Sequence, residues 1–403
     1  MQDMANDGGV TAMKINRRVF LGASALGVVA AGSRAQEKAS SSGKLRACVI
    51  GDTKQGEYGH SLDLAWAAHS DVEVVGLADP DAEGREKHAA AAKAQRSYAD
   101  YREMLDKEKP DLVSIAPRWT VHHREYLLAA VACGAHGFME KPLAVDLAEA
   151  DEMIAATDAK NLKWAIAFNF RASPIVQHAR RLIMDEGLIG DILELRARGK
   201  EDPRAGGEDL LVLGTHLFDL MRFFVGNPLW CSADITVDGR AATRADIHEA
   251  TEPLGPILGN SIQAAYGFAN GIAGHFASKK NADGNQGRWG LDVYGSKGIV
   301  TMRMDVVPSV YLLRDPSWAP GGKDAAWEPL PGAPEVVVKD RALEANTPIV
   351  DDLLAAIRED RRPRVSIQDG RDSLEMIQAV YAAYLNGGRI PLPLAKREHP
   401  LKG

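Results

Sequence analysis

Cysteine is scarce in this chain, with only Cys48, Cys133 and Cys231 among 403 residues. Their spacing matches neither a zinc site nor a disulfide framework, so the sequence predicts no metal site and no disulfide-rich fold. An excess of positive charge is also missing, because 48 Lys and Arg residues stand against 55 Asp and Glu residues, a net charge of −7. A mildly acidic chain lacks the basic surface that binds a phosphate backbone, which excludes a nucleic-acid partner.

Long hydrophobic runs are missing too, since the apolar segment 19–32 has only 14 residues. A helix needs about 20 residues to span the hydrocarbon layer of a membrane. Lys14, Arg17 and Arg18 precede this segment, and the small residues Ser33 and Ala35 follow it. The pattern is typical of a removable signal peptide, and the arginine pair resembles the twin-arginine (Tat) type.

We therefore expect a signal peptide over residues 1–35, a polar linker over 36–44, and a periplasmic or otherwise exported protein without an integral membrane domain. The Tat export machinery would then be a partner. The alternative is a disordered tail that contains a chance arginine pair. With 45% apolar and 26% charged residues, the rest of the chain has the composition of an ordinary globular protein.

Strands and helices are predicted to alternate over the first half of the chain. Strand-like runs cover 45–50, 72–78, 111–116, 136–139 and 162–168, and helices are expected over 59–69, 82–94, 121–133 and 143–159. This alternation is typical of a doubly wound parallel sheet, the Rossmann architecture, which we assign to residues 45–170. Ligands of such sheets bind at the carboxyl ends of the strands.

From about residue 191 the pattern changes to strands separated by turns. The expected strands are 192–198, 230–237, 261–268, 272–278, 291–294, 299–304 and 309–313, with helices at 174–186, 215–224, 348–359 and 370–386. A mostly antiparallel sheet with helices follows from this pattern. We assign it to an α/β domain over residues 171–403.

The turn after the first strand is rich in glycine, with Gly51, Gly56 and Gly59, and Thr53 stands where a second glycine is usual. Such turns let the backbone approach a pyrophosphate. Asp79 ends the second strand, where a carboxylate accepts hydrogen bonds from the adenosine ribose of NAD. The alternatives are an ordinary glycine-rich turn and a turn-forming Asp before Pro80.

Two further segments carry groups suited to proton transfer. Glu140, Lys141 and Pro142 follow the fifth strand, and a buried lysine can polarise a substrate oxygen. His216 and Asp219 are three residues apart and therefore share one helix face. The structural alternatives are a solvated Glu–Lys pair and a core histidine.

Together these segments resemble the Gfo/Idh/MocA family, named for glucose–fructose oxidoreductase, inositol 2-dehydrogenase and a rhizopine-catabolism protein. The resemblance runs over residues 45–394. Its segments are Asp79, Pro117 with the His122 helix, 140–142, 168–171, 187–190, 214–219, 295–298 and 369–371. It implies a Rossmann domain and a C-terminal α/β domain with a large, mostly antiparallel open sheet. In the family this sheet often forms an oligomer interface, so a homo-oligomer is expected.

The resemblance also implies hydride transfer between NAD(P) and a hydroxyl-bearing carbon of a sugar or cyclitol. Lys141 would be the catalytic lysine and His216 the proton-transfer histidine. Glu140 would join Gly51, Thr53, Gly56, Gly59 and Asp79 at the cofactor. The charged residues Arg171, Asp209 and Asp219 are predicted to bind the carbohydrate substrate. NAD is favoured over NADP because Asp79 repels a 2′-phosphate, although Arg85 lies nearby.

Two departures from the family pattern stand out. The glycine spacing is stretched, and Val212 stands where the family often has an Asp four residues before His216. Glu208 or the substrate would have to fill that place, since Asp209 lies about 10 Å further along a helix. At the crevice, Pro117, Arg118 and Trp119 are predicted to line the dinucleotide groove, with surface packing of Trp119 as the alternative.

The sequence thus predicts an NAD(P)-dependent oxidoreductase acting on a carbohydrate, with the cofactor held tightly because NADH is scarce outside the cytoplasm. Two alternatives stay open. One is NAD-assisted elimination or glycoside cleavage through transient oxidation. The other is a non-catalytic sugar- or nucleotide-binding protein on the same fold.

Overall fold

The structure is a computed structural model that describes residues 43–280, 286–305, 307–322, 325–335 and 341–402. The predicted signal peptide lies outside the described residues, as does most of the linker. Within these ranges, no helix combines the length and apolar composition needed to cross a membrane.

A six-stranded parallel sheet forms the N-terminal half, with strand order β3-β2-β1-β4-β5-β6. Its strands are β1 (Leu45–Ile50), β2 (Val72–Ala78), β3 (Arg96–Tyr98), β4 (Leu112–Ile115), β5 (His136–Met139) and β6 (Trp164–Ile166). The apolar runs of β1, β4 and β6 are almost wholly buried, as expected for strands covered on both faces. The predicted doubly wound Rossmann sheet is therefore confirmed.

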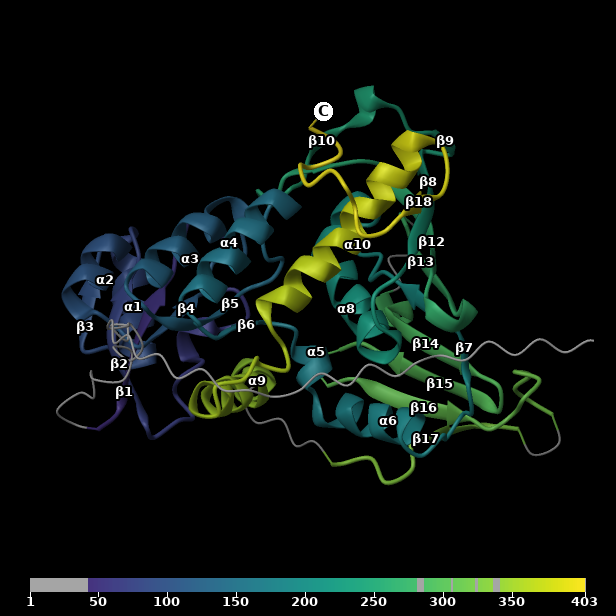
Figure 1. Cartoon of the computed structure of the whole chain (residues 1–403), viewed down its shortest axis with the longest axis horizontal. Helices are drawn as coiled ribbons and strands as arrows, with labels where there is room; N and C mark the ends of the chain where they lie inside the picture. The colour runs from purple at the N-terminus through teal and green to yellow at the C-terminus, as the bar shows by residue number, and fades with distance from the viewer. Residues whose placement is uncertain (1–42, 281–285, 306, 323–324, 336–340, 403) are drawn as a thin grey trace, which may run out of the picture. The chain divides into compact units, whose positions relative to one another are not determined.

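Four helices pack beside this sheet (Figure 1). They are α1 (Ala82–Ala92), α2 (Tyr101–Glu108), α3 (His123–Ala132, preceded by the 3₁₀ turn η2, Thr120–His122) and α4 (Leu147–Ala159). Asp81, Asp100 and Asp146 stand at the N-caps of α1, α2 and α4, and each accepts a backbone N–H of the first turn. Such caps satisfy donors that the helix itself leaves unpaired.

The prediction of a helix over residues 59–69 is wrong. That connection contains only turns and the short 3₁₀ segment η1 (Leu62–Leu64). Glu57, Gly59 and Ser61 all have positive φ angles, of 56°, 55° and 60°. Left-handed residues at alternate positions cannot belong to a right-handed α-helix. As a result, no α-helix starts at the end of β1 in the described chain.

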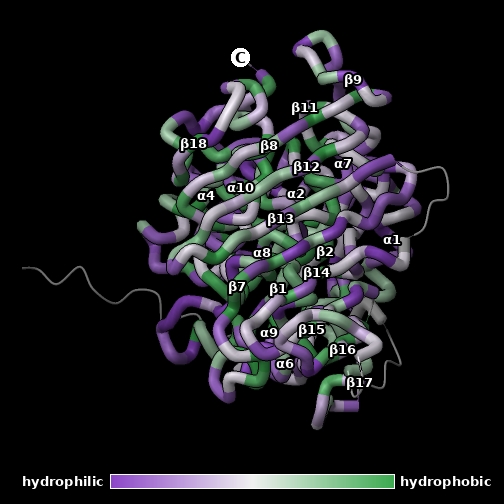
Figure 2. The backbone as a smooth tube through the Cα atoms, turned by 90° about the vertical axis from the view of Figure 1, so that its right-hand side faces the viewer, coloured by the Kyte–Doolittle hydropathy of each residue, from purple (hydrophilic) through white to green (hydrophobic). Residues whose placement is uncertain are grey.

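The C-terminal half is built on a second, ten-stranded sheet with the order β17-β16-β15-β14-β7-β13-β12-β8-β18, and β9 pairs with β8. Its longer strands are β7 (Ile192–Arg198), β8 (Trp230–Val237), β12 (Ser261–Gly267), β13 (Ala273–Lys279), β14 (Gly290–Gly295), β15 (Gly298–Arg303) and β16 (Ser309–Leu313). Only β7 and β13 pair in parallel among its strands. Figure 2 shows these strands side by side across one broad sheet, which confirms the predicted open, mostly antiparallel sheet.

Shorter elements complete this half. They are β9 (Arg240–Ala241), β17 (Trp327–Pro329), β18 (Ile390–Pro391), the hairpin β10 (His248–Glu249) and β11 (Pro256–Ile257), and the 3₁₀ turns η3 (Arg244–Asp246), η4 (Ala269–Gly271) and η5 (Gln286–Arg288). The helices are α5 (Asn169–Ala172), α6 (Pro174–Met184), α7 (Gly207–Val212), α8 (Gly214–Val225), α9 (Arg341–Arg358) and α10 (Ile367–Asn386). The predicted domain boundary at 170/171 falls inside α5 and stays a prediction.

Helix α10 joins the two halves, because it packs against β8 and α8 on one side and against α4 on the other (Figure 1). Ser366 and Asp369 form a capping box at its start, and the Tyr266 hydroxyl of β12 donates a 2.9 Å hydrogen bond to the Met376 carbonyl. This packing fixes α8 relative to the first sheet, and α8 carries His216.

Candidate active site

The predicted site residues follow the carboxyl ends of neighbouring parallel strands. Gly51 follows β1, Asp79 follows β2, and Glu140 lies directly after β5. Pro117 lies two residues beyond Ile115, the last residue of β4. Because the sheet order places β4 on the far side of β1 from β2, the crevice between β1 and β4 is a topological switch point. Dinucleotides bind at such points in doubly wound sheets.

Lys141 is buried at this edge, with only 3% of its surface exposed. Its Nζ donates a 3.1 Å hydrogen bond to the backbone carbonyl of Val212. Burial lowers the pKa of Lys141, with Glu140 and Glu252 opposing the shift and Arg204 and Arg118 adding to it. A lysine in this environment gives up its proton more readily than an exposed one, as a proton-transfer group requires.

A break between two helices explains how Val212 contacts Lys141. Helix α7 ends at Val212 and α8 begins at Gly214, with Leu213 between them. Carbonyls in the last turn of a helix lack partners within that helix. The Val212 carbonyl is therefore free to accept a hydrogen bond from Lys141. At the position where the family often has an Asp side chain, this chain uses a backbone oxygen.

His216 lies in the first turn of α8 and is 4% exposed. Its ring packs edge-on against Phe168 and Phe170, at centroid distances of 5.8 and 4.8 Å. Its Nδ1 is buried and lacks a hydrogen-bond partner within the described ranges. Burial, followed by the charge of Lys141, lowers the pKa of His216 well below its usual range, so the imidazole is neutral.

The structure thus brings Lys141 and His216 together, although 75 positions separate them in the sequence. Val212, which binds the ammonium group, is four positions before His216, and the charge of Lys141 acts on the imidazole. One group with a lowered pKa and one neutral base therefore share a buried region beside the crevice. This pairing can move a proton to or from a hydroxyl group placed between them.

Glu140 connects the turn after β1 to the end of β5. It is fully buried and accepts hydrogen bonds from the backbone N–H of His60 at 2.7 Å and of Lys141 at 2.9 Å, and its Oε1 also contacts His60 Nδ1. Burial alone would raise the pKa of Glu140, but His60 and Lys141 lower it to about 2. A Cβ at Gly59 would overlap this carboxyl side chain, so the glycine permits the contact.

Several buried polar atoms lie beyond β4. Trp119 Nε1 and Thr120 Oγ1 have no hydrogen-bond partner among the residues that the structure describes, and Arg118 Nε makes only a 3.8 Å ion pair with the Glu252 carboxyl. Because an unpaired buried donor costs free energy, such a cluster points to a ligand or water that satisfies it. Polar groups of a dinucleotide are one kind of partner that such donors accept, and dinucleotide binding by Pro117, Arg118 and Trp119 stays a prediction.

At the other end of the crevice, the predicted residues contact one another. Thr53 and the unpredicted Tyr58 both hydrogen-bond to Asp79, whose surface is fully buried. The Gly56 carbonyl accepts the N–H of Arg118 at 3.1 Å, which ties the first turn to the end of β4. A Cβ at Gly51 would overlap the ring of Tyr58.

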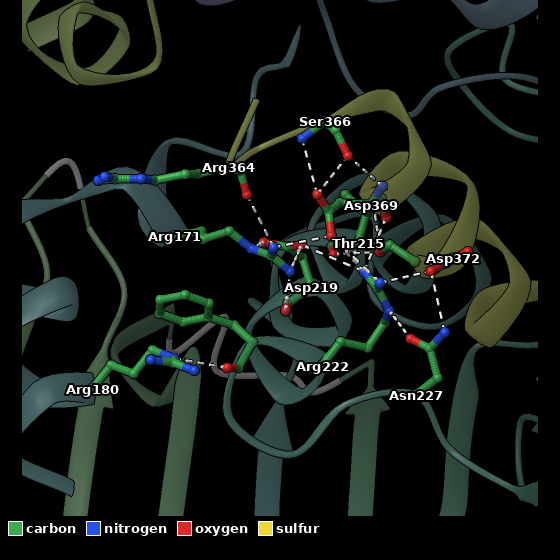
Figure 3. Close-up of polar contacts among 12 residues, drawn as sticks. Arg171, Arg180, Thr215, Asp219, Arg222, Asn227, Arg364, Ser366, Asp369 and Asp372 are labelled. Atoms are coloured by element: carbon green, nitrogen blue, oxygen red, sulfur yellow. Dashed lines mark hydrogen bonds and ion pairs between the residues drawn. The ribbon is translucent and has the colours of Figure 1, made fainter. Parts of the chain in front are cut away.

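The predicted substrate-binding residues Arg171 and Asp219 pair with each other in a buried network (Figure 3). Arg171 Nε lies 2.9 Å from Asp219 Oδ2, and Arg171 Nη1 lies 3.0 Å from Asp369. Burial and the charge of Asp369 raise the pKa of Asp219 to about 6, against the effect of Arg171 and Arg222. The network links α5, α8 and α10, and its contact with a substrate stays a prediction.

The carboxyl groups of Asp209 and Glu208 also bind other groups of the protein. Asp209 accepts the N–H groups of Lys200 and Glu201 and the Ser278 hydroxyl, and it is fully buried. Glu208 accepts the backbone N–H of Thr251 at 3.1 Å. Neither carboxyl takes the place of an Asp at position 212, and substrate binding by Asp209 stays a prediction.

The sequence analysis did not identify Tyr58 and His60, which shape the crevice from the first turn. The only available signal was their place in the glycine-rich segment. Arg204 and Glu252 were missed as well, although both act on the pKa of Lys141. Within the described ranges, no group of three His, Cys, Asp or Glu residues could hold a metal ion.

Comparison with known proteins identifies relatives of the chain. D-apiose dehydrogenase of Paraburkholderia graminis is 27% identical over 83% of this chain and 87% of the relative. Levoglucosan dehydrogenase of Pseudarthrobacter phenanthrenivorans is 28% identical over 52% of this chain, and the match spans only 60% of that relative. A solved structure of levoglucosan dehydrogenase with NADH and levoglucosan has a TM-score of 0.70 at 22% identity, covering 87% of this chain and all of the other.

Two family models match in sequence order. The model described as an oxidoreductase family with an NAD-binding Rossmann fold covers residues 45–168. The model for the C-terminal alpha/beta domain of the same family covers residues 195–392. The matches agree with the two sheets, and together they span most of the chain. The chain belongs to the Gfo/Idh/MocA family of NAD-binding oxidoreductases.

Proposed function

We propose that this protein is an NAD-dependent oxidoreductase that oxidises a hydroxyl group of a sugar, cyclitol or related carbohydrate, or reduces the matching ketone. The observation that carries the proposal is the shared buried position of Lys141 and His216 beside the Val212 carbonyl. Relatives named for levoglucosan, D-apiose and myo-inositol support a polyhydroxylated substrate.

The residues that would hold the cofactor are those at the strand ends. Asp79 would bind the adenosine ribose. The buried polar side-chain atoms of Arg118, Trp119 and Thr120 would form hydrogen bonds with the dinucleotide. When bound, NAD supplies two-electron redox chemistry at the carbon that carries the hydroxyl group.

Proton transfer is the part of the reaction that the chain itself performs. The Lys141 ammonium group, held by the Val212 carbonyl, would stabilise negative charge on the reacting oxygen. The neutral His216 would take the hydroxyl proton, at the Nδ1 atom that has no protein partner in the described structure. In the reverse direction, the protonated histidine would return that proton to the carbonyl oxygen.

Aromatic side chains surround the reacting groups. Phe168 and Phe170 pack on His216, and Trp289 packs edge-on against Phe170 at 5.3 Å. Such rings exclude water from the imidazole and strengthen its interactions with a bound substrate.

The direct test is to purify the full chain, identify any bound nucleotide by mass spectrometry, and supply NAD⁺ with a panel of pyranoses, anhydrosugars, pentoses and inositols. The expected result is binding of NAD(H) and a substrate-dependent rise in absorbance at 340 nm. No uptake of NAD⁺ at millimolar concentration, or no absorbance change across the panel in either direction, would contradict the proposal.

We also propose that the protein is exported through the Tat route, on the strength of Arg17, Arg18 and the apolar segment 19–32. The Tat route carries folded proteins, so the cofactor would be bound before export. Replacing both arginines with lysine should retain the protein in the cytoplasmic fraction. An unchanged distribution between cytoplasm and periplasm would refute this.

A further inference from the structure

The turn after β1 uses the protein's own carboxyl groups to bind its backbone N–H groups. Asp52 Oδ1 accepts the N–H of Lys54 and of Gln55, each at 3.1 Å. Asp79 Oδ2 accepts the N–H of Thr53 at 3.1 Å, and Glu140 accepts that of His60 at 2.7 Å. In dinucleotide-binding turns, N–H groups at this place bind the pyrophosphate. Here the N–H groups of Thr53, Lys54, Gln55 and His60 are already occupied.

The carboxyl group expected to bind the ribose is occupied as well. Asp79 Oδ2 accepts the Thr53 hydroxyl at 2.6 Å and the Tyr58 hydroxyl at 2.7 Å. Its other oxygen accepts the backbone N–H of Asp81 at 2.8 Å, and the residue is fully buried. A ribose hydroxyl that binds Asp79 Oδ2 would need a position that the Thr53 or Tyr58 hydroxyl holds in this structure.

The ring of Tyr58 fills the space above the end of β1. It is 3% exposed, lies against Gly51, and stacks on His88 with ring centroids 3.7 Å apart and an interplanar angle of 15°. His88 belongs to α1 and is itself held by Asp63 at 2.7 Å. The ring is therefore fixed by contacts on both sides as well as by its hydroxyl group.

We propose that Tyr58 determines the affinity for the dinucleotide, because its hydroxyl group occupies the ribose-binding oxygen of Asp79 and must leave before the cofactor can bind. Thr53 takes part in the same way with its smaller side chain. The inference rests on the proposed function in that it needs NAD to be the ligand. It goes beyond that function by assigning a competing role to residues outside the reacting centre.

The expected consequence follows from the population of the open state. When only a fraction of the protein has Asp79 free, the apparent dissociation constant equals the intrinsic constant divided by that fraction. Removing a hydroxyl group that holds Asp79 increases the open fraction and tightens binding. A structural role alone would leave the affinity unchanged or weaken it.

The test is calorimetric titration of NAD⁺ into the full chain after exchange of any co-purified nucleotide. Tyr58→Phe keeps the ring and its stacking on His88, and it should bind NAD⁺ about tenfold more tightly than the parent protein. Thr53→Val is a second variant of matched shape, with a smaller gain because the Thr53 N–H still binds Asp79. Tyr101→Phe is the control, since its hydroxyl contacts the exposed Glu125 at 2.6 Å, and it should bind as the parent does.

Equal or weaker binding by both Tyr58→Phe and Thr53→Val, with circular dichroism like that of the parent, would overturn the inference while leaving the proposed function in place. Absence of NAD⁺ binding in the parent and in every variant would overturn the proposed function as well. If Tyr58→Phe binds NAD⁺ and the parent protein does not, the result supports the inference that the Tyr58 hydroxyl blocks the cofactor.

Discussion

Replacing Glu140 with Gln tests how the end of β5 is held against the first turn. The substitution keeps the shape of the side chain but removes a negative charge that accepts hydrogen bonds from His60 and Lys141. The pKa of Glu140 lies at about 2 in the folded protein, against an ordinary value of 4.5. A difference of about 2.5 between these pKa values corresponds to about 3 kcal/mol at neutral pH.

Water at the half-exposed ring of His60 screens part of this interaction, so we expect Glu140→Gln to lower the free energy of unfolding by about 2–3 kcal/mol at pH 7. Because the folded pKa is depressed, this stabilisation is complete above pH 4.5 and is lost as the pH falls towards 2. The gap between the parent and the variant should therefore be constant from pH 5 to 7 and shrink below pH 4.5.

Urea unfolding followed by tryptophan fluorescence at a series of pH values measures this gap. Glu152→Gln is the control, since Glu152 pairs with Arg124 on the surface and should contribute less than about 1 kcal/mol. Equal stability of Glu140→Gln and the parent at pH 7 would refute the reasoning. A gap that does not change between pH 5 and 3 would refute it too.

Two other predictions concern the buried network and the crevice. Arg171→Met leaves the buried Asp219 and Asp369 without one of their cations, and it should lower the free energy of unfolding by about 3–5 kcal/mol, measured as a lower Tm. The control Arg124→Met, at the surface, should change the Tm little. Equal Tm values for Arg171→Met and the parent would show that the network contributes nothing to stability. Trp119→Phe removes the buried Nε1 donor, and it should weaken NAD⁺ binding by about fivefold to tenfold in calorimetry while the fold stays intact. Unchanged affinity would mean that this donor does not contact the cofactor.

The strand ends of the first sheet could be predicted from the sequence because short apolar runs alternate with helical segments. That pattern alone places Gly51, Asp79 and Lys141 at one edge. The segment 59–69 misled the prediction because its apolar spacing suits a helix. The left-handed φ angles of Glu57 and Ser61 prevent the helix, and the backbone N–H of His60 binds Glu140, which lies 80 positions away in the sequence.

Other parts of the site depend on geometry that residue types do not encode. The Val212 side chain suggested a missing acid, yet its backbone carbonyl binds Lys141 because a helix ends there. The contact between Tyr58 and Asp79 joins positions 21 residues apart, and nothing in the local pattern indicates it. Arg171 and Asp219 carry charges that suit a substrate, but only the packing of α5 against α8 shows that they pair with each other.

The central claim is that Lys141 and His216 act together on a substrate beside bound NAD, and Lys141→Met tests it most directly. We expect this variant to bind NAD⁺ within twofold of the parent and to lose at least a thousandfold in carbohydrate-dependent turnover at 340 nm, while Lys107→Met, an exposed lysine on α2, keeps full activity. Turnover by Lys141→Met at a rate near that of the parent would contradict the account.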